Sequence, residues 1–248
     1  MKRKNAAAMG RRDAPGGILQ KILASKRREV DRLRIALDAK ALERTVRPTP
    51  RRFAAALRRP GPGFIFEYKR GSPSLGQVSR DRPLGEVAAA YRPFADAVSV
   101  LTDREYFDGD FSDLAALRRE VAQPILCKDF IIDEIQVLLA RRAGADAILL
   151  ILSSLTDRVY ERLSRTARAL DMDVLTEVHT ADEMTRAGAL GATLIGINNR
   201  NLSSLLVSSE VTRRLAPLAP AGAALVSESG IQTRRDIVHL APLVDAFL

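Results

Sequence analysis

The sequence predicts an α/β protein folded as a (β/α)8 barrel, with an extra helix before the barrel. Short apolar segments alternate with helical patterns from residue 64 to residue 248. Continuous apolar strands between helices are typical of a parallel sheet that is covered on both faces. Eight such repeats fit a barrel of about 200 to 250 residues. A doubly wound open sheet is the alternative, but the sequence has neither a G-x-G-x-x-G nor a G-x-x-x-x-G-K-[ST] motif to support it.

The elements follow from hydrophobic spacing. An amphipathic helix is expected over 18–40, where Ile18, Ile22, Val30, Leu33 and Leu37 recur at helical intervals. A polar stretch with prolines follows at 44–50. Strands are expected at 64–67, 97–101, 124–128, 147–152, 174–178, 193–198, 224–227 and 244–248. Helices are expected at 84–94, 111–121, 134–143, 157–170, 181–190, 209–215 and 233–240.

The basic charge is concentrated at the N-terminus. Residues 1–60 carry 18 Lys and Arg against 5 Asp and Glu, a formal charge of +13, while residues 61–248 carry 21 against 25, a charge of −4. We therefore expect three parts: a flexible basic tail over 1–16, a helical extension over 17–60 and the barrel over 61–248. Because the basic residues do not spread through the barrel, no nucleic-acid partner is expected.

Composition excludes several other classes. One cysteine, Cys127, excludes a disulfide framework, and two histidines argue against a metal site. The longest apolar run, 147–152, is too short to span a membrane, and the N-terminus lacks the apolar segment of a signal peptide. We therefore expect a cytoplasmic protein that contacts no membrane.

Polar side chains follow the apolar segments where a barrel places its active site, at the carboxyl ends of the strands. Two glutamates and a lysine that lie close together and away from water can transfer protons near neutral pH. Ser229 and Gly230 precede a helix and favour a phosphate ligand. These strand-end residues are Glu67 and Lys69, Lys128, Glu177, Asn198 to Arg200, and Ser227 to Gly230.

We interpret His179 and Cys127 as structural residues, without a direct role in catalysis. His179 follows Glu177 by two positions and so shares its face of an extended strand, but we interpret it as a loop residue at the start of the next helix. Cys127 alternates away from Lys128 towards the helices, so we interpret it as a core residue.

Six segments, in chain order, resemble the indole-3-glycerol phosphate synthase family. They are E-x-K-x-x-S-P-S at 67–74, S-V-L-T-D at 99–103 with Y-F at 106–107, P-I-L-C-K-D-F at 124–130, L-T-E-V at 175–178, I-G-I-N-N-R at 195–200 and S-E-S-G-I at 227–231. The resemblance runs from about Ile18 to the last residue. It implies a step of tryptophan biosynthesis, in which 1-(2-carboxyphenylamino)-1-deoxyribulose 5-phosphate is closed to a ring, decarboxylated and dehydrated to indole-3-glycerol phosphate, carbon dioxide and water.

The resemblance also implies roles for the catalytic residues. Lys128 would be the general acid that protonates the ribulose carbonyl, and Glu177 the base or proton shuttle of the dehydration. Glu67 would assist proton transfer and orient the lysine, and Asn198 would hold a substrate hydroxyl or the catalytic carboxylate. No cofactor is implied, because the iminium formed by ring closure accepts the electrons of decarboxylation.

The remaining implied roles concern substrate binding. Lys69, Ser72 and Arg200 would receive the anthranilate carboxylate, and Glu228 would hold the ribulose hydroxyls. Ser229 and Gly230 would help to bind phosphate. The aromatic pocket would be lined by Pro73, Phe107, Phe130, Leu149 and Ile151.

The sequence departs from the family pattern at two places. Asn201 stands where the family usually has Asp, with a modest local effect expected. Residues 244–248 match the interior of the eighth strand, so the final phosphate-binding loop and the eighth helix are expected to be missing. Segments 125–133 and 174–178 resemble bifunctional chains, which implies a C-terminal phosphoribosylanthranilate isomerase domain in the full-length protein.

Two other functions stay open on the residues alone. A different phosphate-binding barrel enzyme, such as a sugar-phosphate isomerase, would not require an anthranilate carboxylate and ring in its substrate. A non-catalytic barrel that binds nucleic acid through its basic N-terminus would show steeply salt-dependent RNA binding.

Overall fold

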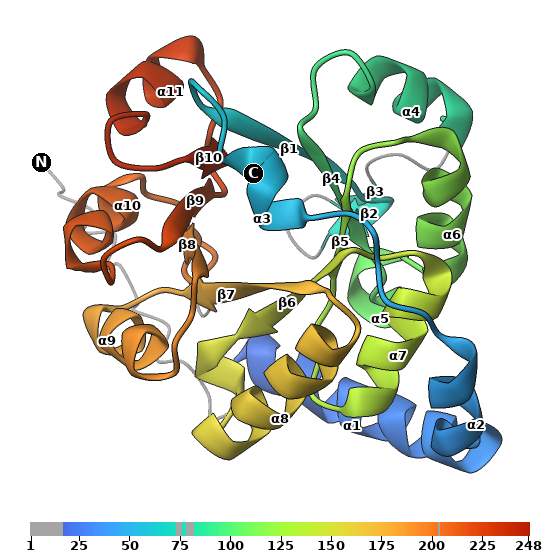
Figure 1. Ribbon diagram of the computed structural model, residues 1–248. Helices are drawn as coiled ribbons and strands as arrows, with labels where there is room; N and C mark the ends of the chain where they lie inside the picture. The colour runs from blue at the N-terminus through green and yellow to red at the C-terminus, as the bar shows by residue number, and fades with distance from the viewer. Residues whose placement is uncertain (1–16, 73–75, 78–81, 203) are drawn as a thin grey trace, which may run out of the picture.

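Eight parallel strands form a closed barrel (Figure 1). The computed structural model describes residues 17–72, 76–77, 82–202 and 204–248. Strands that follow one another around the barrel pair in parallel, and Gly63 opposite Ala246 closes the ring. The strands are β1 (Gly63–Tyr68), β4 (Ala97–Leu101), β5 (Ile125–Lys128), β6 (Ala147–Ile151), β7 (Asp173–Val178), β8 (Leu194–Asn198), β9 (Ala224–Glu228) and β10 (Ala246–Phe247). The predicted (β/α)8 barrel is confirmed.

Helices surround the strands at the positions that hydrophobic spacing predicts. Several begin at a side chain that accepts a hydrogen bond from a free backbone N–H group, which stabilises the first turn. Asp133 does so with a full capping box, and Thr156, Thr180 and Thr233 also cap helices. These helices are α4 (Leu84–Tyr91), α6 (Phe111–Glu120), α7 (Glu134–Ala143), α8 (Asp157–Ala169), α9 (Ala181–Ala189), α10 (Glu210–Leu215) and α11 (Arg234–Leu240).

The N-terminal segment differs from the single helix expected over 18–40. It forms α1 (Ile18–Ala36) and α2 (Ala39–Thr45), separated by the extended residues Leu37 and Asp38. Asp38 accepts hydrogen bonds from the backbone of Lys40 and Ala41, so it starts a new helix in place of continuing the first. The division of the chain at residues 16 and 60 stays a prediction, and the tail over 1–16 lies outside the described residues.

A short helix that the sequence analysis missed, α3 (Phe53–Leu57), closes one end of the barrel. Phe53 and Leu57 are fully buried, and the Ala54 N–H donates to Asp173 at the start of β7, 2.9 Å away. Figure 1 shows α3 across the centre of the ring. The room for these side chains comes from alanines that begin four strands: Ala97, Ala147, Ala224 and Ala246.

The strands separate two cores, because successive side chains of a strand point to opposite faces. On β6, Ala147, Leu149 and Ile151 point into the barrel, while Ile148 and Leu150 pack against the helices. All five are buried. Burial on both faces explains why β6 reads as a continuous apolar run.

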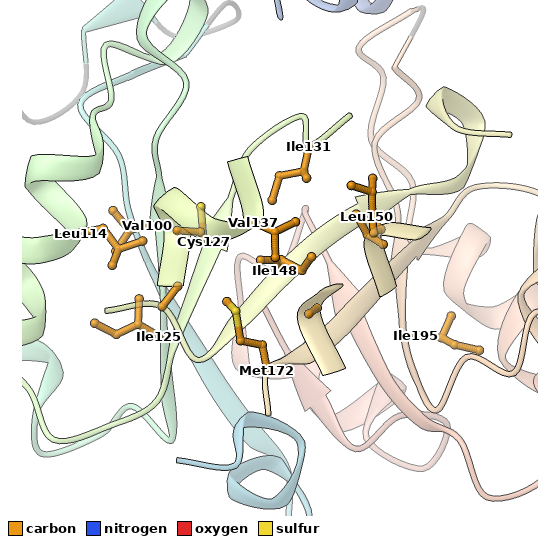
Figure 2. Close-up of a cluster of buried hydrophobic side chains, with 14 of the residues drawn as sticks. Val100, Leu114, Ile125, Cys127, Ile131, Val137, Ile148, Leu150, Met172 and Ile195 are labelled. Atoms are coloured by element: carbon orange, nitrogen blue, oxygen red, sulfur yellow. The ribbon is translucent and has the colours of Figure 1, made fainter. Parts of the chain in front are cut away.

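Cys127 belongs to the outer core (Figure 2). Its thiol is fully buried among side chains that include Val100 and Leu114, and burial raises its pKa to about 12. The interpretation of Cys127 as a core residue is confirmed.

Several short elements lacked a periodic signal. They are α5 (Arg104–Phe107), the hairpin of β2 (Gly71–Ser72) with β3 (Gly76–Gln77), and the 3-10 turns η1 (Leu152–Ser154) and η2 (Ala216–Leu218). Within the described ranges, no helix has the length and apolar character needed to cross a membrane.

Candidate active site

A pocket of about 970 Å³, counted together with its opening to solvent, lies at the carboxyl ends of the barrel strands. The strands and the segments directly after them supply its charged residues, and α1 supplies an apolar wall of Ile18, Leu19 and Ile22. The remaining lining residues are Glu67, Lys69, Ser72, Leu101, Phe107, Lys128, Asp129, Phe130, Leu149, Ile151, Glu177, Asn198, Arg200, Leu202, Leu205 and Ser229.

Most of the residues singled out from the sequence therefore share one pocket. Two of the described residues with an expected catalytic or binding role do not line it. Glu228 is fully buried and reaches the site through Lys128, and Gly230 lies outside the lining. Pro73 lies outside the described residues.

Lys128 lies among carboxylates. Its Nζ is 2.9 Å from Oε2 of Glu228 on β9 and 3.5 Å from Oε2 of Glu67 on β1. Glu67 is shared, because its Oε1 accepts a hydrogen bond from Lys69 Nζ at 2.8 Å. The two lysines and the two glutamates form a chain of ion pairs across the barrel mouth.

These contacts and burial shift the pKa values of Lys128, Glu67 and Glu228 in definite directions. Burial alone would lower the pKa of Lys128, but Glu228, Glu67 and Glu177 together raise it above the ordinary lysine value. Burial would raise the pKa of Glu67, yet Lys128 and Lys69 hold it below the usual range. For Glu228, burial dominates and raises the pKa to about 7 despite the ion pair with Lys128. Glu228 thus changes its charge near neutral pH.

Glu177 is held from two sides. His179 Nε2 lies 3.2 Å from its Oε1, and the amide of Asn198 hydrogen bonds to the carboxylate. The Asn198 Oδ1 atom accepts from the backbone N–H of Arg200 at 2.9 Å, which leaves the amide NH₂ for Glu177. Burial would raise the pKa of Glu177, but His179, Lys128 and Asn198 lower it, so this side chain is a carboxylate.

Glu228 requires a glycine opposite it. A Cβ on Gly196 of β8 would lie 1.9 Å from Oε1 of Glu228 and 3.3 Å from Leu175 Cδ1. Among the residues that the structure describes, none donates a hydrogen bond to that Oε1 atom, although it is buried. Gly196 thus leaves the space in which Glu228 turns its other oxygen to Lys128.

The segment after β9 turns sharply. Ser229 and Gly230 both have positive φ, of 69° and 79°. Ser229 is fixed through its backbone, since its N–H donates to the Leu248 carbonyl at 3.0 Å and its carbonyl accepts from Asn199 Nδ2 at 3.1 Å. A side chain at Gly230 would meet Val207 Cγ1 at 2.4 Å, so only glycine fits there.

Apolar side chains from the barrel form a second apolar wall of the pocket. The rings of Phe107 and Phe130 lie 6.2 Å apart between centroids, inclined by 35°. With Leu149 and Ile151 from β6 they give the pocket a flat, largely apolar side that suits an aromatic ring.

A buried ion cluster that was not predicted from the sequence lies beside this wall. Lys26 of α1 is fully buried, and its Nζ lies 2.8 Å from Asp129 and 3.0 Å from Asp103. The signal was available, because Lys26 stands midway between Ile22 and Val30, on the apolar face of α1. A lysine in an apolar stripe indicates a buried partner.

His179 lies in the loop between β7 and α9, as expected, but its ring also contacts Glu177. Among the described residues, no group of three or more His, Cys, Asp or Glu side chains is arranged to hold a metal ion.

Comparison with known proteins identifies the family. The family model for indole-3-glycerol phosphate synthase matches residues 19–248. The "Tryptophan biosynthesis protein TrpCF" of Vibrio parahaemolyticus is 44% identical over 235 residues, which cover 93% of this chain and 49% of that protein. The protein of the same name from Salmonella typhi is 42% identical over 93% of this chain and 51% of its own length, and that from Vibrio cholerae is 49% identical over 75% and 39%. The chain spans about half the length of the curated relatives it matches, and it belongs to the indole-3-glycerol phosphate synthase family.

Proposed function

We propose that this chain converts 1-(2-carboxyphenylamino)-1-deoxyribulose 5-phosphate to indole-3-glycerol phosphate, carbon dioxide and water. The observation that carries the proposal is the placement of Lys128 between Glu67 and Glu228, beside the carboxylate of Glu177, in a pocket with an apolar wall. Family membership supports it independently.

This geometry supports the proton-transfer roles that the family resemblance implies. Lys128 is the general acid at the ribulose carbonyl, and Glu177 is the base or shuttle of the dehydration. A lysine with a raised pKa is a weak acid near pH 7, where acid catalysis works best with a matched pKa. When Glu228 turns to the ribulose hydroxyls, Lys128 loses its 2.9 Å carboxylate partner. Its pKa then falls, and the proton becomes easier to donate.

Cations and small groups at the rim would bind the two anionic ends of the substrate. Lys69 and Arg200 line the pocket and would receive the anthranilate carboxylate with Ser72. Ser229 and Gly230 would help to bind the phosphate at the turn after β9. Phe107 and Phe130 would flank the aromatic ring. Pro73 remains assigned to the same wall by the resemblance alone.

The test is loss of turnover with retention of the fold. Lys128→Met and Glu177→Gln should each lower kcat by about 10²- to 10⁴-fold, the usual contribution of an acid or base group. Product is followed by indole fluorescence, and circular dichroism checks the fold. Lys40→Met, at an exposed lysine of α2, is the control. Near-normal turnover in either site variant would refute the assigned role.

The relatives suggest a second domain. Since those proteins are about twice as long as the matched region, we propose that a phosphoribosylanthranilate isomerase domain follows the barrel in the full-length protein. Reading the gene beyond codon 248 tests this, and a stop codon at that point would contradict it.

A further inference from the structure

His179 is held by carboxylates at both ring nitrogens. Nε2 lies 3.2 Å from Oε1 of Glu177, and Nδ1 lies 3.4 Å from Oε2 of Glu183 in the first turn of α9. The same Glu183 oxygen accepts the backbone N–H of His179 at 2.7 Å. Glu183 therefore fixes both the main chain and the ring of His179, and the ring in turn abuts Glu177.

This arrangement defines the protonation of the ring. A neutral imidazole carries one N–H donor and one acceptor nitrogen, whereas a carboxylate only accepts. Both nitrogens of His179 face carboxylate oxygens, so a neutral ring would set an acceptor against an acceptor. The ring is not aligned for an ideal hydrogen bond to Glu177, so that contact is mainly one of charge. Two carboxylates beside the two ring nitrogens favour an imidazolium.

We propose that His179 is a positioning residue for the reaction, whose imidazolium holds Glu177 as an oriented carboxylate. The inference rests on the proposed function, in which Glu177 moves a proton. His179 does not line the pocket, so it acts through Glu177 and not on the substrate. With Oε1 of Glu177 turned to His179, the carboxylate is fixed where Asn198 and Lys128 also face it.

The charges around the pair agree with this role. The side chains of Glu177 and His179 are 2% and 13% exposed, so solvent screens their interaction little. Burial would lower the pKa of His179, but Glu177 and Glu183 raise it to about 10. When Glu228 is ionised it repels the charge of Glu177, which makes the cation of His179 more important for keeping Glu177 ionised.

Nuclear magnetic resonance tests the charge directly, because the chain has only two histidines. His239 is exposed on α11 and serves as the internal reference, assigned by its loss in His239→Gln. We expect the ¹⁵N shifts of His179 to stay those of a doubly protonated ring at pH 8. A His179 ring that is neutral at pH 8 would overturn the proposal, and this readout needs neither substrate nor a folded site variant.

Kinetics test the coupling to Glu177. His179→Gln keeps a neutral donor near Glu177, whereas His179→Ala removes donor and charge. Both variants should shift the acid limb of the kcat–pH profile to higher pH by about one unit, as expected on losing a close opposite charge. In His179→Ala, kcat should also fall about 10- to 100-fold from loss of orientation, with little change in KM. His239→Gln should match the wild type.

A merely structural role gives a different pattern. It would lower the thermal midpoint and the fraction of active protein but leave the acid limb in place. A folded His179→Ala variant with the wild-type acid limb and kcat within twofold of wild type would refute the proposal. If the wild type shows no synthase turnover, the proposed function fails instead, and the resonance experiment still reports whether His179 carries the charge.

Discussion

Replacing Lys26 by methionine should undock α1 from the barrel. The Lys26 ammonium is fully buried and contacts Asp129 at 2.8 Å, Asp103 at 3.0 Å and Glu29 at 2.9 Å. Methionine fills much the same space but leaves the two aspartates, each 1% exposed at the side chain, without their cation. Their remaining partners are mainly backbone groups and the hydroxyl of Thr102.

Lys26→Met should lower the free energy of unfolding by a large amount for a single substitution. Removing one partner of a buried ion pair costs about 3–5 kcal/mol. At about 2–4 °C per kcal/mol for a domain of this size, the thermal midpoint should fall by about 6–20 °C. This is an upper limit, because α1 can separate while the barrel stays folded, and the loss is then confined to the docking of α1.

Calorimetry combined with hydrogen exchange distinguishes destabilisation of the whole domain from separation of α1 alone. Amides of α1 should lose protection in Lys26→Met, and KM should rise, since α1 contributes Ile18, Leu19 and Ile22 to the pocket. Lys21→Met, at an exposed position of the same helix, should behave as wild type. Burial already raises the pKa of Asp103. The stability difference between wild type and Lys26→Met should therefore shrink as the pH falls and Asp103 takes up a proton. A midpoint within 1–2 °C of wild type, with α1 protection intact, would refute the reasoning.

Three further outcomes are expected. Gly196→Ala should lower the free energy of unfolding by about 1–3 kcal/mol through overpacking. It should also lower kcat, because the new Cβ displaces Glu228 from Lys128. A crystal structure of the variant with this ion pair unmoved would contradict the prediction. Cys127 should resist thiol reagents until the protein unfolds, since its thiol is fully buried with a pKa of about 12. For His179, whose pKa rises from 6.5 to about 10 on folding, stabilisation is complete below pH 6.5 and is lost towards pH 10. The difference in thermal midpoint between wild type and His179→Gln should therefore shrink over that range.

The barrel was predictable because its signal is local and repeated. Each strand is an apolar run with a helical pattern on either side, and the carboxyl ends of those runs gave Glu67, Lys128 and Glu177 as partners in one pocket. Parallel topology brings strand ends together whatever the sequence between them. The exact contacts were not predictable in the same way. Lys128 and Glu228 are 100 positions apart, and their 2.9 Å ion pair depends on the closure of the whole ring.

The missed features have weak or ambiguous local signals. The sequence of α3 is a run of apolar and small residues with no polar face, because the helix is a plug and not a surface element. The break before α2 is marked only by Asp38, whose capping role is indistinguishable in the sequence from an ordinary exposed aspartate. His179 is expected from the sequence to be a loop residue before a helix, whereas the orientation of its ring depends on Glu183, four residues on.

Four consecutive residues, two at the end of β5 and two just after it, connect the stability of the fold with the pocket. Cys127 points into the outer core, Lys128 into the pocket, Asp129 to Lys26 of α1, and Phe130 to the apolar wall. Asp129 also accepts the backbone N–H of Phe130 at 2.7 Å. Because Lys26 holds Asp129, and Asp129 holds the backbone between Lys128 and Phe130, the docking of α1 and the placement of Lys128 and Phe130 depend on one another. The Lys26→Met variant should for this reason lose kcat as well as affinity, and a change confined to KM would show that α1 acts only as a cover.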